Sequence, residues 1–456
     1  MVGVSVALDL QKRGRDVVLI DRRGAGEETS YGNSGLIQRE GVIPYTFPRE
    51  FGAVLSYAMN HRRDVTYHLS ALPRLAPWLF RYWQNATPER VERSAQALAP
   101  LMAQCAGEHD ALIAEAGNAA SALVKHEGWI RCLRTEESLR QAIANARRLD
   151  KYRVDYAVLT GAQLRELEPH LSDKIIGAVH FRGSPTSSDP GMLTKAYADL
   201  FMRRGGRFLK GDARRLAEEA PGWSLPSESG SISAREAVVA LGPWSDDVFR
   251  PLGYDIPLAV KRGYHMHYGA RGNATLSHPL HDGDGGYMLV PMSKGIRLTT
   301  GVEFADRDAP PNPIQLTRDE PVARELFPLG ERLEPAPWLG RRPCLPDMVP
   351  MIGQGTRPSR PVVRLWPCPP RLHARPGYWQ AARRNDDWRD TVYRSVTLLR
   401  EPLRQLSGAC HEGLRRIASL HAIVEGVEHG FCGPLGARGI PHHQRARTRD
   451  TQGLRS

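Results

Sequence analysis

The 456-residue sequence predicts an α/β fold of two interleaved domains, one built on a parallel sheet and the other, α+β, on an antiparallel sheet. Two runs, 17–20 (VVLI) and 237–241 (AVVAL), are continuously apolar and rich in β-branched residues, as is typical of strands buried on both faces of a parallel sheet. From 257 to 304, apolar and polar residues alternate between Gly and Asp turns, which predicts antiparallel strands with one covered face.

The N-terminal segment has the pattern of half a mononucleotide-binding unit. Residues 2–13 predict an amphipathic helix closed by Gly14, and the buried run that follows ends at Asp21. In a Rossmann-like βαβ unit, an acidic residue at this point accepts hydrogen bonds from ribose hydroxyls. The first strand and its GxGxxG turn would precede Met1, and only Gly3 stands where the third glycine allows close helix–strand packing. We therefore expect a Rossmann-like domain without its first strand and glycine loop.

The segment 29–37, TSYGNSGLI, gathers small residues and hydroxyls. Such a composition is needed where backbone must approach a ligand closely. For the segment taken by itself, a plain surface turn is the better explanation. Its position five residues after VVLIDRR favours the ligand-binding interpretation.

Residues 46–150 are mostly helical by pattern, with breaks at prolines and a polar helix near 136–150. We expect their aromatic residues to serve core or inter-domain packing; these are Trp78, Phe80, Tyr82 and Trp83. A later helix is more sharply defined. Asp189 is a favourable N-cap, Pro190 suits the first helical position, and Gly205-Gly206 end the helix.

The formal charge of +12 is concentrated near the C-terminus. Residues 357–456 hold eighteen arginines, no lysine and eight acidic residues, so the rest of the chain carries only about +2. A nearly neutral body argues against a nucleic-acid-binding protein.

Neither a signal peptide nor an apolar run of bilayer-spanning length is visible. The six cysteines are scattered without CxxC spacing, so we expect no zinc site, no disulfide framework and a cytoplasmic location. His265 and His267 stand at alternate positions of one predicted strand without a carboxylate or cysteine nearby in the sequence. We therefore expect structural histidines and no metal.

Several segments together carry a resemblance to a known family: VVLIDRRGAGEETSYGNSGLIQ, KRGYH, GGYMLVPM, GIRLTTGVEFA and, from Trp338, WLGRRP followed by LPD and PMIG. They resemble flavoenzymes of the D-amino-acid oxidase superfamily, particularly bacterial D-amino-acid dehydrogenases of the small-subunit type. The resemblance implies a flavoprotein oxidoreductase whose cofactor is FAD.

The resemblance also implies which residues touch the cofactor. Asp21 and Arg22 would meet the adenosine half of FAD. The residues that would line the flavin and its pyrophosphate are Thr29, Ser30, Asn33, Ser34, Gly35 and Leu36. Ala213 would contact adenine through its backbone, and Gly242 would end a strand beside the dinucleotide.

For the reaction, the resemblance implies oxidative deamination of D-amino acids or related imino acids, by hydride transfer from the substrate Cα to flavin N5. Arg342 would hold the substrate carboxylate in a bidentate ion pair. Tyr264 and Tyr287 would line the substrate pocket. Electrons would pass to a quinone or another acceptor, or to oxygen, and membrane association would be at most peripheral, at the inner face of the plasma membrane.

The resemblance divides the chain into three parts. An FAD-binding domain is expected at 1–45, 185–255 and 338–355, and a substrate domain at 46–184 and 256–337. The remainder, 356–456, is rich in Arg and Pro, and we expect it to be irregular or disordered.

This tail departs from the family pattern and leaves two explanations open. It is either a basic interaction tail or the product of a GC-rich gene read out of frame from about Thr356, and the scattered arginines favour the second. The alternative to an active enzyme is accordingly an inactive, truncated and frame-altered copy that does not bind FAD. A nucleic-acid-binding function would depend on the tail alone.

Overall fold

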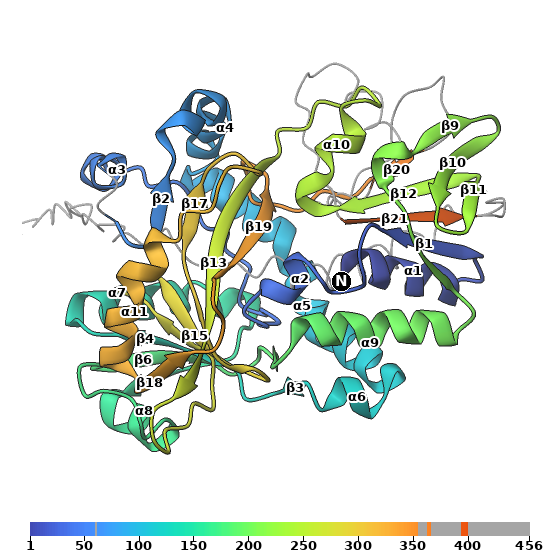
Figure 1. Ribbon diagram of the computed structural model, residues 1–456. Coiled ribbons are helices and arrows are strands. Elements are labelled where there is room, and N and C mark those ends of the chain that lie inside the picture. The colour runs from blue at the N-terminus through green and yellow to red at the C-terminus, as the bar shows by residue number, and fades with distance from the viewer. Residues whose placement is uncertain (60–61, 354–362, 366–393, 400–456) are drawn as a thin grey trace, which may run out of the picture.

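The computed structural model describes residues 1–59, 62–353, 363–365 and 394–399 (Figure 1). Within these residues the predicted α/β class is confirmed, with one main sheet in each of two regions that lie side by side. The tail 356–456, and with it the frameshift hypothesis, lies outside the described residues except for two short strands.

The smaller region contains a five-stranded sheet in the order β20-β12-β21-β1-β8. Its strands are β1 (Val17–Asp21), β8 (Arg207–Lys210), β12 (Glu236–Leu241), β20 (Val363–Leu365) and β21 (Arg394–Leu399). The pairs β1–β8 and β12–β20 are parallel, whereas β21 runs antiparallel to both of its neighbours. A separate antiparallel sheet of β9 (Ala217–Glu219), β10 (Gly222–Ser227) and β11 (Gly230–Ala234) lies nearby (Figure 1).

Two helices cover one side of this sheet, and both begin and end as predicted. Helix α1 (Val2–Lys12) is followed by Gly14, whose φ of 75° is accessible to glycine at little cost. Helix α9 (Pro190–Arg203) is capped by Asp189, whose Oδ1 accepts a hydrogen bond of 2.9 Å from the Met192 backbone N–H. Their apolar faces pack together with β1 in one core cluster.

The larger region is organised around a mostly antiparallel sheet in the order β2-β17-β13-β16-β15-β14-β4-β6-β5, with β18 and β19 also paired to β13. Its strands are β2 (Val65–Tyr67), β4 (Trp129–Leu133), β5 (Tyr156–Thr160), β6 (Gly177–Phe181), β13 (Ala259–Ala270), β14 (Leu280–Asp282), β15 (Tyr287–Met292), β16 (Gly295–Thr299), β17 (Val302–Phe304), β18 (Leu329–Arg332) and β19 (Trp338–Cys344). A two-stranded pair of β3 (Val124–Lys125) and β7 (Thr186–Ser187) stands apart from it.

The position of β19 differs from the predicted domain boundary. The sequence assigned 338–355 to the cofactor domain, but β19 pairs with β13 from Ala259↔Cys344 to His265↔Trp338 and therefore belongs to the large sheet. Both strands run along the border between the two regions in Figure 1. Because the backbone partner of a strand depends on long-range contacts, local pattern does not reveal this pairing.

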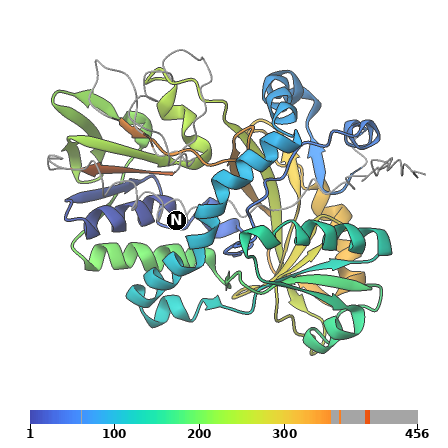
Figure 2. The ribbon, with the colours of Figure 1, turned by 180° about the vertical axis from the view of Figure 1, so that it is seen from behind.

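The remaining helices are distributed over both regions. Those of the described chain beyond α1 and α9 are α2 (Thr29–Gly32), α3 (Phe51–Ala58), α4 (Leu72–Gln84), α5 (Pro88–Ala116), α6 (Asn118–Ser121), α7 (Glu136–Arg147), α8 (Gly161–Leu167), α10 (Asp246–Phe249) and α11 (Ile314–Leu326). Helix α5 runs obliquely behind both regions (Figure 2). Its Leu98 packs in the core of the large sheet and its Ile113 packs with α1 and α9, so it ties the two regions together. No helix in the described ranges is long and apolar enough to cross a bilayer.

The four aromatic residues of α4 do not share one environment. Trp78 and Tyr82 are buried and pack with Phe304, as expected for core residues. Phe80 and Trp83 are exposed, so the packing role predicted for them is wrong.

One carboxyl group is buried in the large region without a hydrogen-bond partner. Asp319 on α11 is fully buried, and neither of its carboxylate oxygens has a partner within the described part of the chain. Desolvation, with the charges of Asp282 and Asp64, raises the pKa of Asp319 to about 8.

Asp319 should make the protein less stable as the pH rises. Above about pH 4 the unfolded chain releases this proton, whereas the folded protein keeps it to about pH 8, so the free energy of unfolding falls with pH between these values. Asp319→Asn should reduce this slope by about 1.4 kcal/mol per pH unit, as measured by urea denaturation at a series of pH values. Asp308→Asn, at a side chain that is 62% exposed, is the control; equal slopes in wild type and Asp319→Asn would contradict the assignment.

Candidate functional site

The candidate site lies where the loop after β1 meets β13 and β19 of the large sheet. The Thr29 hydroxyl donates a hydrogen bond of 3.1 Å to the Arg341 carbonyl oxygen, which joins α2 to β19. The Met1 nitrogen lies 3.1 Å from Ser30 Oγ, so the start of α1 also reaches this loop. Gly3, in the first turn of α1, is buried as close helix–strand packing requires. The loop after β1 therefore contacts both the N-terminus of α1 and strand β19 of the large sheet.

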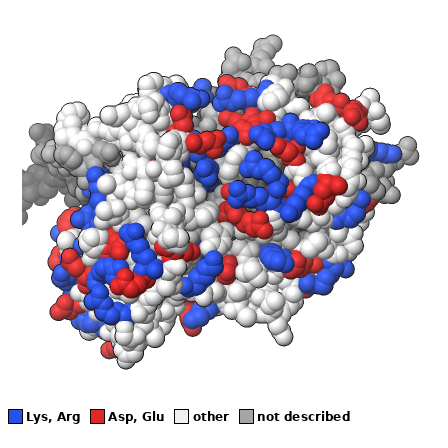
Figure 3. Space-filling view, viewed as in Figure 1, with Lys and Arg blue, Asp and Glu red and all other residues white. Residues whose placement is uncertain are grey.

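A cavity at the carboxyl ends of β1, β8 and β12 contains the first group of predicted residues. Its lining includes Asp21, Arg22, Ala213 and Trp244. Figure 3 shows Lys and Arg side chains gathered around a hollow beneath α10, the part of the molecule to which this cavity belongs. The carboxyl ends of parallel strands are where α/β folds bind nucleotides.

One glycine, Gly211, lines this cavity, and another, Gly242, directly follows its lining residue Leu241. A Cβ at Gly211 would lie 2.8 Å from the Ile20 side chain, and the Gly211 amide donates to the Asp21 carbonyl oxygen at 3.0 Å. Gly242, at the end of β12, has a φ of 55°. The Asp21 carboxylate accepts a hydrogen bond of 2.9 Å from the Arg23 backbone N–H, which fixes its position at the end of the strand.

The loop from Thr29 to Leu36 is held in one conformation. The Asn33 side-chain oxygen accepts a 2.6 Å hydrogen bond from the Gly35 N–H. Gly35 has a φ of 73°, and a Cβ there would lie 2.1 Å from the Ser187 carbonyl oxygen, so only glycine fits. Most of the loop is buried, including Thr29, Ser30, Ser34 and Leu36. This burial rules out the alternative of a plain surface turn.

Arg297 on β16 anchors the same loop, and the sequence analysis missed it. Its guanidinium is buried and donates to the carbonyl oxygens of Tyr31 and Asn33, the former at 3.0 Å. Its Nε donates to His267 Nε2 at 3.0 Å. The available signal was an arginine inside the apolar strand pattern GIRLTT, since a buried arginine requires several acceptors.

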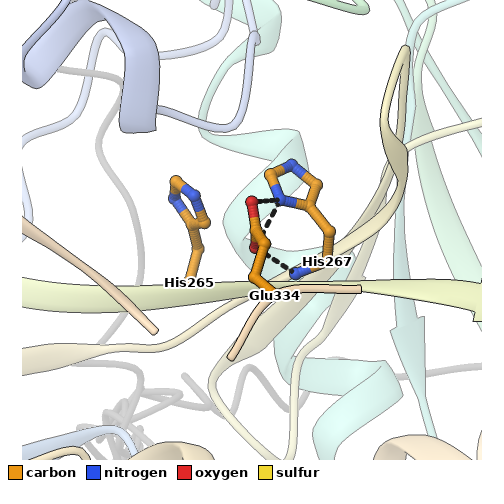
Figure 4. Close-up of side chains that lie close together, drawn as sticks. All are labelled: His265, His267 and Glu334. Atoms are coloured by element: carbon orange, nitrogen blue, oxygen red, sulfur yellow. Dashed lines mark hydrogen bonds and ion pairs between the residues drawn. The ribbon is translucent and has the colours of Figure 1, made fainter. Parts of the chain in front are cut away.

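His265 and His267 lie beside a carboxylate that the sequence did not suggest (Figure 4). His267 Nδ1 is 2.9 Å from both carboxylate oxygens of Glu334, and its Nε2 accepts from Arg297. Both ring nitrogens are therefore engaged. Burial first, and then the Arg297 charge, lower the pKa of each histidine.

This arrangement favours structural histidines over a metal site. The fixed positive charge of Arg297 next to His267 would repel a cation, and a metal would have to displace an existing hydrogen bond. The His265 ring stacks on Trp338 with ring centroids 4.9 Å apart. The expectation that this chain holds no metal therefore stays our prediction.

Arg342 on β19 lies across a small cavity from the Thr29–Leu36 loop. It lies opposite Lys261 in the β13–β19 register, and its guanidinium crosses Gly263, where a Cβ would lie 2.5 Å from Nη2. Its Nη1 donates to the Gly301 carbonyl oxygen at 3.2 Å. A cavity of about 20 Å³ beside it is lined by residues of both domains, among them Thr29, Asn33 and Trp338. The structure thus brings Arg342 and the predicted flavin loop together.

The neighbouring Lys261 is buried without a carboxylate contact in this part of the structure. Its Nζ lies 4.4 Å from the centre of the Tyr82 ring and 5.6 Å from that of Trp78. Burial lowers the pKa of its ammonium group. The faces of the Tyr82 and Trp78 rings stabilise the ammonium group when it is protonated.

Tyr264 is among the residues that line the small cavity beside Arg342, but the phenol groups of Tyr264 and Tyr287 both lie elsewhere. Tyr264 follows Gly263 on β13, so its side chain points to the opposite face of the sheet, where its hydroxyl donates to Glu303 at 2.9 Å. Tyr287 packs in the core cluster on that opposite face, together with Met266 and Leu289. The structure does not bring either phenol to the predicted carboxylate site.

A much larger cavity, about 400 Å³, lies on the loop-facing side of the large sheet. It is enclosed by the segment 38–53, by α5 and α7, and by Trp129 and Phe181 from β4 and β6. Burial raises the pKa of Glu40 in its wall, a carboxylate that accepts a hydrogen bond of 2.9 Å from Trp129 Nε1. Strands β16, β15 and β14 separate this cavity from β13, so it is distinct from the space beside Arg342.

Groups that suit parts of an FAD molecule lie at two places among the described residues. The cavity at the ends of β1, β8 and β12 offers a carboxylate, backbone groups beside glycines and the Trp244 ring, which suit an adenosine. The loop opposite Arg342 offers hydroxyls and glycines that allow backbone to approach a flat ring closely. Trp338 lies in that second space, since a Cβ at Gly32 would be 1.8 Å from its ring.

The chain is similar to known proteins over most of its length. The family model described as DAO, FAD dependent oxidoreductase, matches residues 1–387. A D-amino-acid oxidase of Bradyrhizobium diazoefficiens is 29% identical over 79% of this chain and 87% of its own length. A D-amino acid dehydrogenase of Methylobacterium sp. strain 4-46 is 30% identical over 77% of this chain and 85% of its own length.

Among solved structures, the glycine oxidase from Geobacillus kaustophilus matches with a TM-score of 0.58 and 18% identity, over 80% of this chain and 86% of that chain. At this identity the likeness concerns the fold. Together with the family match, it shows that the chain belongs to the DAO family of FAD-dependent oxidoreductases.

Proposed function

We propose that this protein oxidises D-amino acids, or related imino acids, with FAD as its cofactor. The observation that carries the proposal is the position of Arg342, whose guanidinium lies across Gly263 opposite the Thr29–Leu36 loop. A planar guanidinium there presents two parallel N–H donors, which match a substrate carboxylate. Two similar proteins are a D-amino-acid oxidase and a D-amino acid dehydrogenase, which supports the same substrate class.

The residues of this chain contribute to the reaction by holding the substrate and the Thr29–Leu36 loop in position. Arg342 holds the carboxylate at the border between the domains, and the absence of a side chain at Gly263 lets its guanidinium cross the neighbouring strand. The bound FAD supplies the hydride acceptor. Arg297, through its bonds to the Tyr31 and Asn33 carbonyl oxygens, keeps the loop in place. The substrate amine reacts in its neutral form, and the imine product hydrolyses in water to a 2-oxo acid and ammonia.

The electrons leave the protein to a quinone or to oxygen. Both outcomes are consistent with the names of the two similar proteins, since one is an oxidase and the other a dehydrogenase. We propose the quinone, because the D-amino acid dehydrogenases form the larger group among the most similar proteins. Oxygen consumption measured against reduction of a soluble quinone, with the same D-amino acid, distinguishes the two.

Asp21 should contribute to cofactor affinity. Asp21→Ala removes the acceptor for the ribose hydroxyls, and a lost hydrogen bond to a charged group raises the dissociation constant of FAD by about tenfold or more. Titration of the apoprotein with FAD, followed by flavin fluorescence, measures this. Asp173→Ala, at an exposed position of the large region, is the control. An unchanged FAD affinity in Asp21→Ala would show that Asp21 does not bind the adenosine part of FAD.

The proposed substrate class is tested by comparing enantiomers. The purified protein is incubated with D- and L-alanine and a redox dye, and 2-oxo acid and ammonia are measured. We expect product from the D-amino acid alone, because Arg342 and the loop fix the carboxylate and only one enantiomer then directs its Cα hydrogen to the cofactor. Product from the L-isomer at an equal rate, or from neither isomer in a flavin-loaded protein, would contradict the proposal.

A further inference from the structure

Lys261 on β13 is a buried cation without a carboxylate partner among the described residues. It is 4% exposed. Its Nζ atom donates to the Tyr82 hydroxyl at 3.3 Å and lies 3.5 Å from the Met348 sulfur. The ring centres of Trp78 and Phe304 lie 5.6 Å and 5.7 Å from the same atom. A hydroxyl and a thioether are weak, neutral partners, and burial of a charge is costly unless the charge is paired.

The side chain of Lys261 lies on the same face of the large sheet as the proposed carboxylate site. In the register of β13 and β19, Lys261 is paired with Arg342, and Gly263 with Gly340. Paired residues of adjacent strands share a face, and so do alternate residues of one strand. This face meets the Thr29–Leu36 loop, because the cavity beside Arg342 is lined both by Gly263 and by residues of that loop.

Lys261 and Arg342 are neighbouring cations on this face. The Arg342 guanidinium crosses β13 at Gly263, where a Cβ would lie 2.5 Å from Nη2. Gly263 is two residues from Lys261, and alternate residues of a strand are only about 7 Å apart. Burial first, and also the Arg342 charge, lower the pKa of the Lys261 ammonium group. Two neighbouring cations, one of them buried, are stabilised by an anion that contacts both.

The carboxylate of the neighbouring strand β17 does not supply this anion. Phe304 is the β17 residue paired with Lys261, whereas Glu303 is paired with Arg262. The Glu303 side chain therefore points to the opposite face, where it accepts a hydrogen bond of 2.7 Å from Arg262 Nε. The described residues thus leave the anion for Lys261 to be supplied by a bound molecule.

We propose that Lys261 binds a second carboxylate of the substrate, carried on its side chain, while Arg342 binds the first. The preferred substrates are then the acidic amino acids D-aspartate and D-glutamate. This inference rests on the proposed reaction and narrows its substrate class. Two carboxylates joined by a short carbon chain match two cations that project from adjacent strands. The aromatic rings around Lys261 keep water from the ion pair, which strengthens the attraction.

Kinetics with a matched pair of substrates test the proposal. D-Glutamate and D-glutamine have nearly the same shape and differ in the charge of the side chain. For the flavin-loaded wild type we expect kcat/KM to be about ten- to a hundredfold higher for D-glutamate, which corresponds to one buried hydrogen bond between charged groups. Lys261→Met fills the space among the rings with an apolar side chain and should abolish this preference. Lys195→Met on α9, at an exposed lysine paired with Asp199, is the control and should retain it.

A binding measurement separates this proposal from the proposed reaction. Glutarate carries two carboxylates but no amine, so it cannot be deaminated, and glutaramate replaces one of the carboxylates by an amide. We expect calorimetric titration to show that glutarate binds about tenfold or more tightly than glutaramate, and that Lys261→Met removes the difference. Such binding in a protein that oxidises neither D-alanine nor D-glutamate would keep the Lys261 site and reject the reaction.

Two results would overturn the proposal. One is a wild type that treats D-glutamate and D-glutamine alike and binds glutarate no more tightly than glutaramate; these comparisons decide the matter even if Lys261→Met fails to fold. The other is a Lys261→Met variant that loses activity with both amino acids to the same extent. Lys261 would then serve a step common to all substrates, such as acceptance of the proton that the substrate amine loses.

Discussion

Arg342→Lys should lower kcat/KM for a D-amino acid by about ten- to a hundredfold, the equivalent of one lost hydrogen bond to a charged group. Lysine keeps the positive charge but cannot offer the two parallel N–H donors that a carboxylate accepts. The substitution also removes the donor to the Gly301 carbonyl oxygen on the far side of Gly263. Steady-state kinetics on the flavin-loaded variant measure the effect.

The control for this prediction is Arg332→Lys on β18. Arg332 is an arginine of the same sheet that pairs with Glu320 on the surface, so the exchange should leave kinetics unchanged. A substrate lacking the carboxylate should react equally poorly with wild type and with Arg342→Lys. If Arg342→Lys kept wild-type kcat/KM, the carboxylate would be bound elsewhere.

Arg262→Met should destabilise the protein by about 3–5 kcal/mol, the range found when one partner of a buried ion pair is removed. Arg262 and Glu303 are both fully buried, and Arg262 Nε donates to Glu303 at 2.7 Å. Methionine fills similar volume but leaves the Glu303 carboxylate without its cation. Among the described residues, Tyr264 and His68 remain as its partners. The midpoint of urea denaturation reports the loss.

Lys174→Met serves as the comparison, because Lys174 forms an exposed ion pair with Glu325 and should change the free energy of unfolding by well under about 1 kcal/mol. The double variant Arg262→Met, Glu303→Gln should recover part of the lost stability, since no unpaired charge then remains. If Arg262→Met alone were as stable as wild type, the ion pair would not contribute to the free energy of unfolding.

The elements that local chemistry determines were predictable from the sequence. The buried strand at Val17–Asp21, the Asp189 cap of α9 and the Gly14 ending of α1 all stand where the pattern placed them. Each depends on residues close together in the chain, such as a capping side chain or a glycine with positive φ. The small residues of the segment that starts at Thr29 likewise indicated a loop whose backbone can approach a ligand closely.

The parts that the sequence did not reveal depend on contacts between distant residues. Glu334 reaches His267 across 67 positions of sequence, and Arg297 finds its acceptors in the loop at Tyr31. The pairing of β19 with β13 is of the same kind. Phe80 and Trp83 were predicted to be packed but are exposed. An aromatic pattern at helical spacing indicates which residues share a helix face, but not whether another element covers that face.

The central claim is that this chain binds FAD at the border between its two domains and that a D-amino acid reduces it there. The most direct measurement is the visible spectrum of the purified protein without oxygen, before and after a D-amino acid is added. We expect a flavin band at about 450 nm that is bleached by the D-amino acid and not by the L-isomer. A protein that shows no flavin band, even after incubation with FAD, would contradict the account and support the inactive-copy alternative.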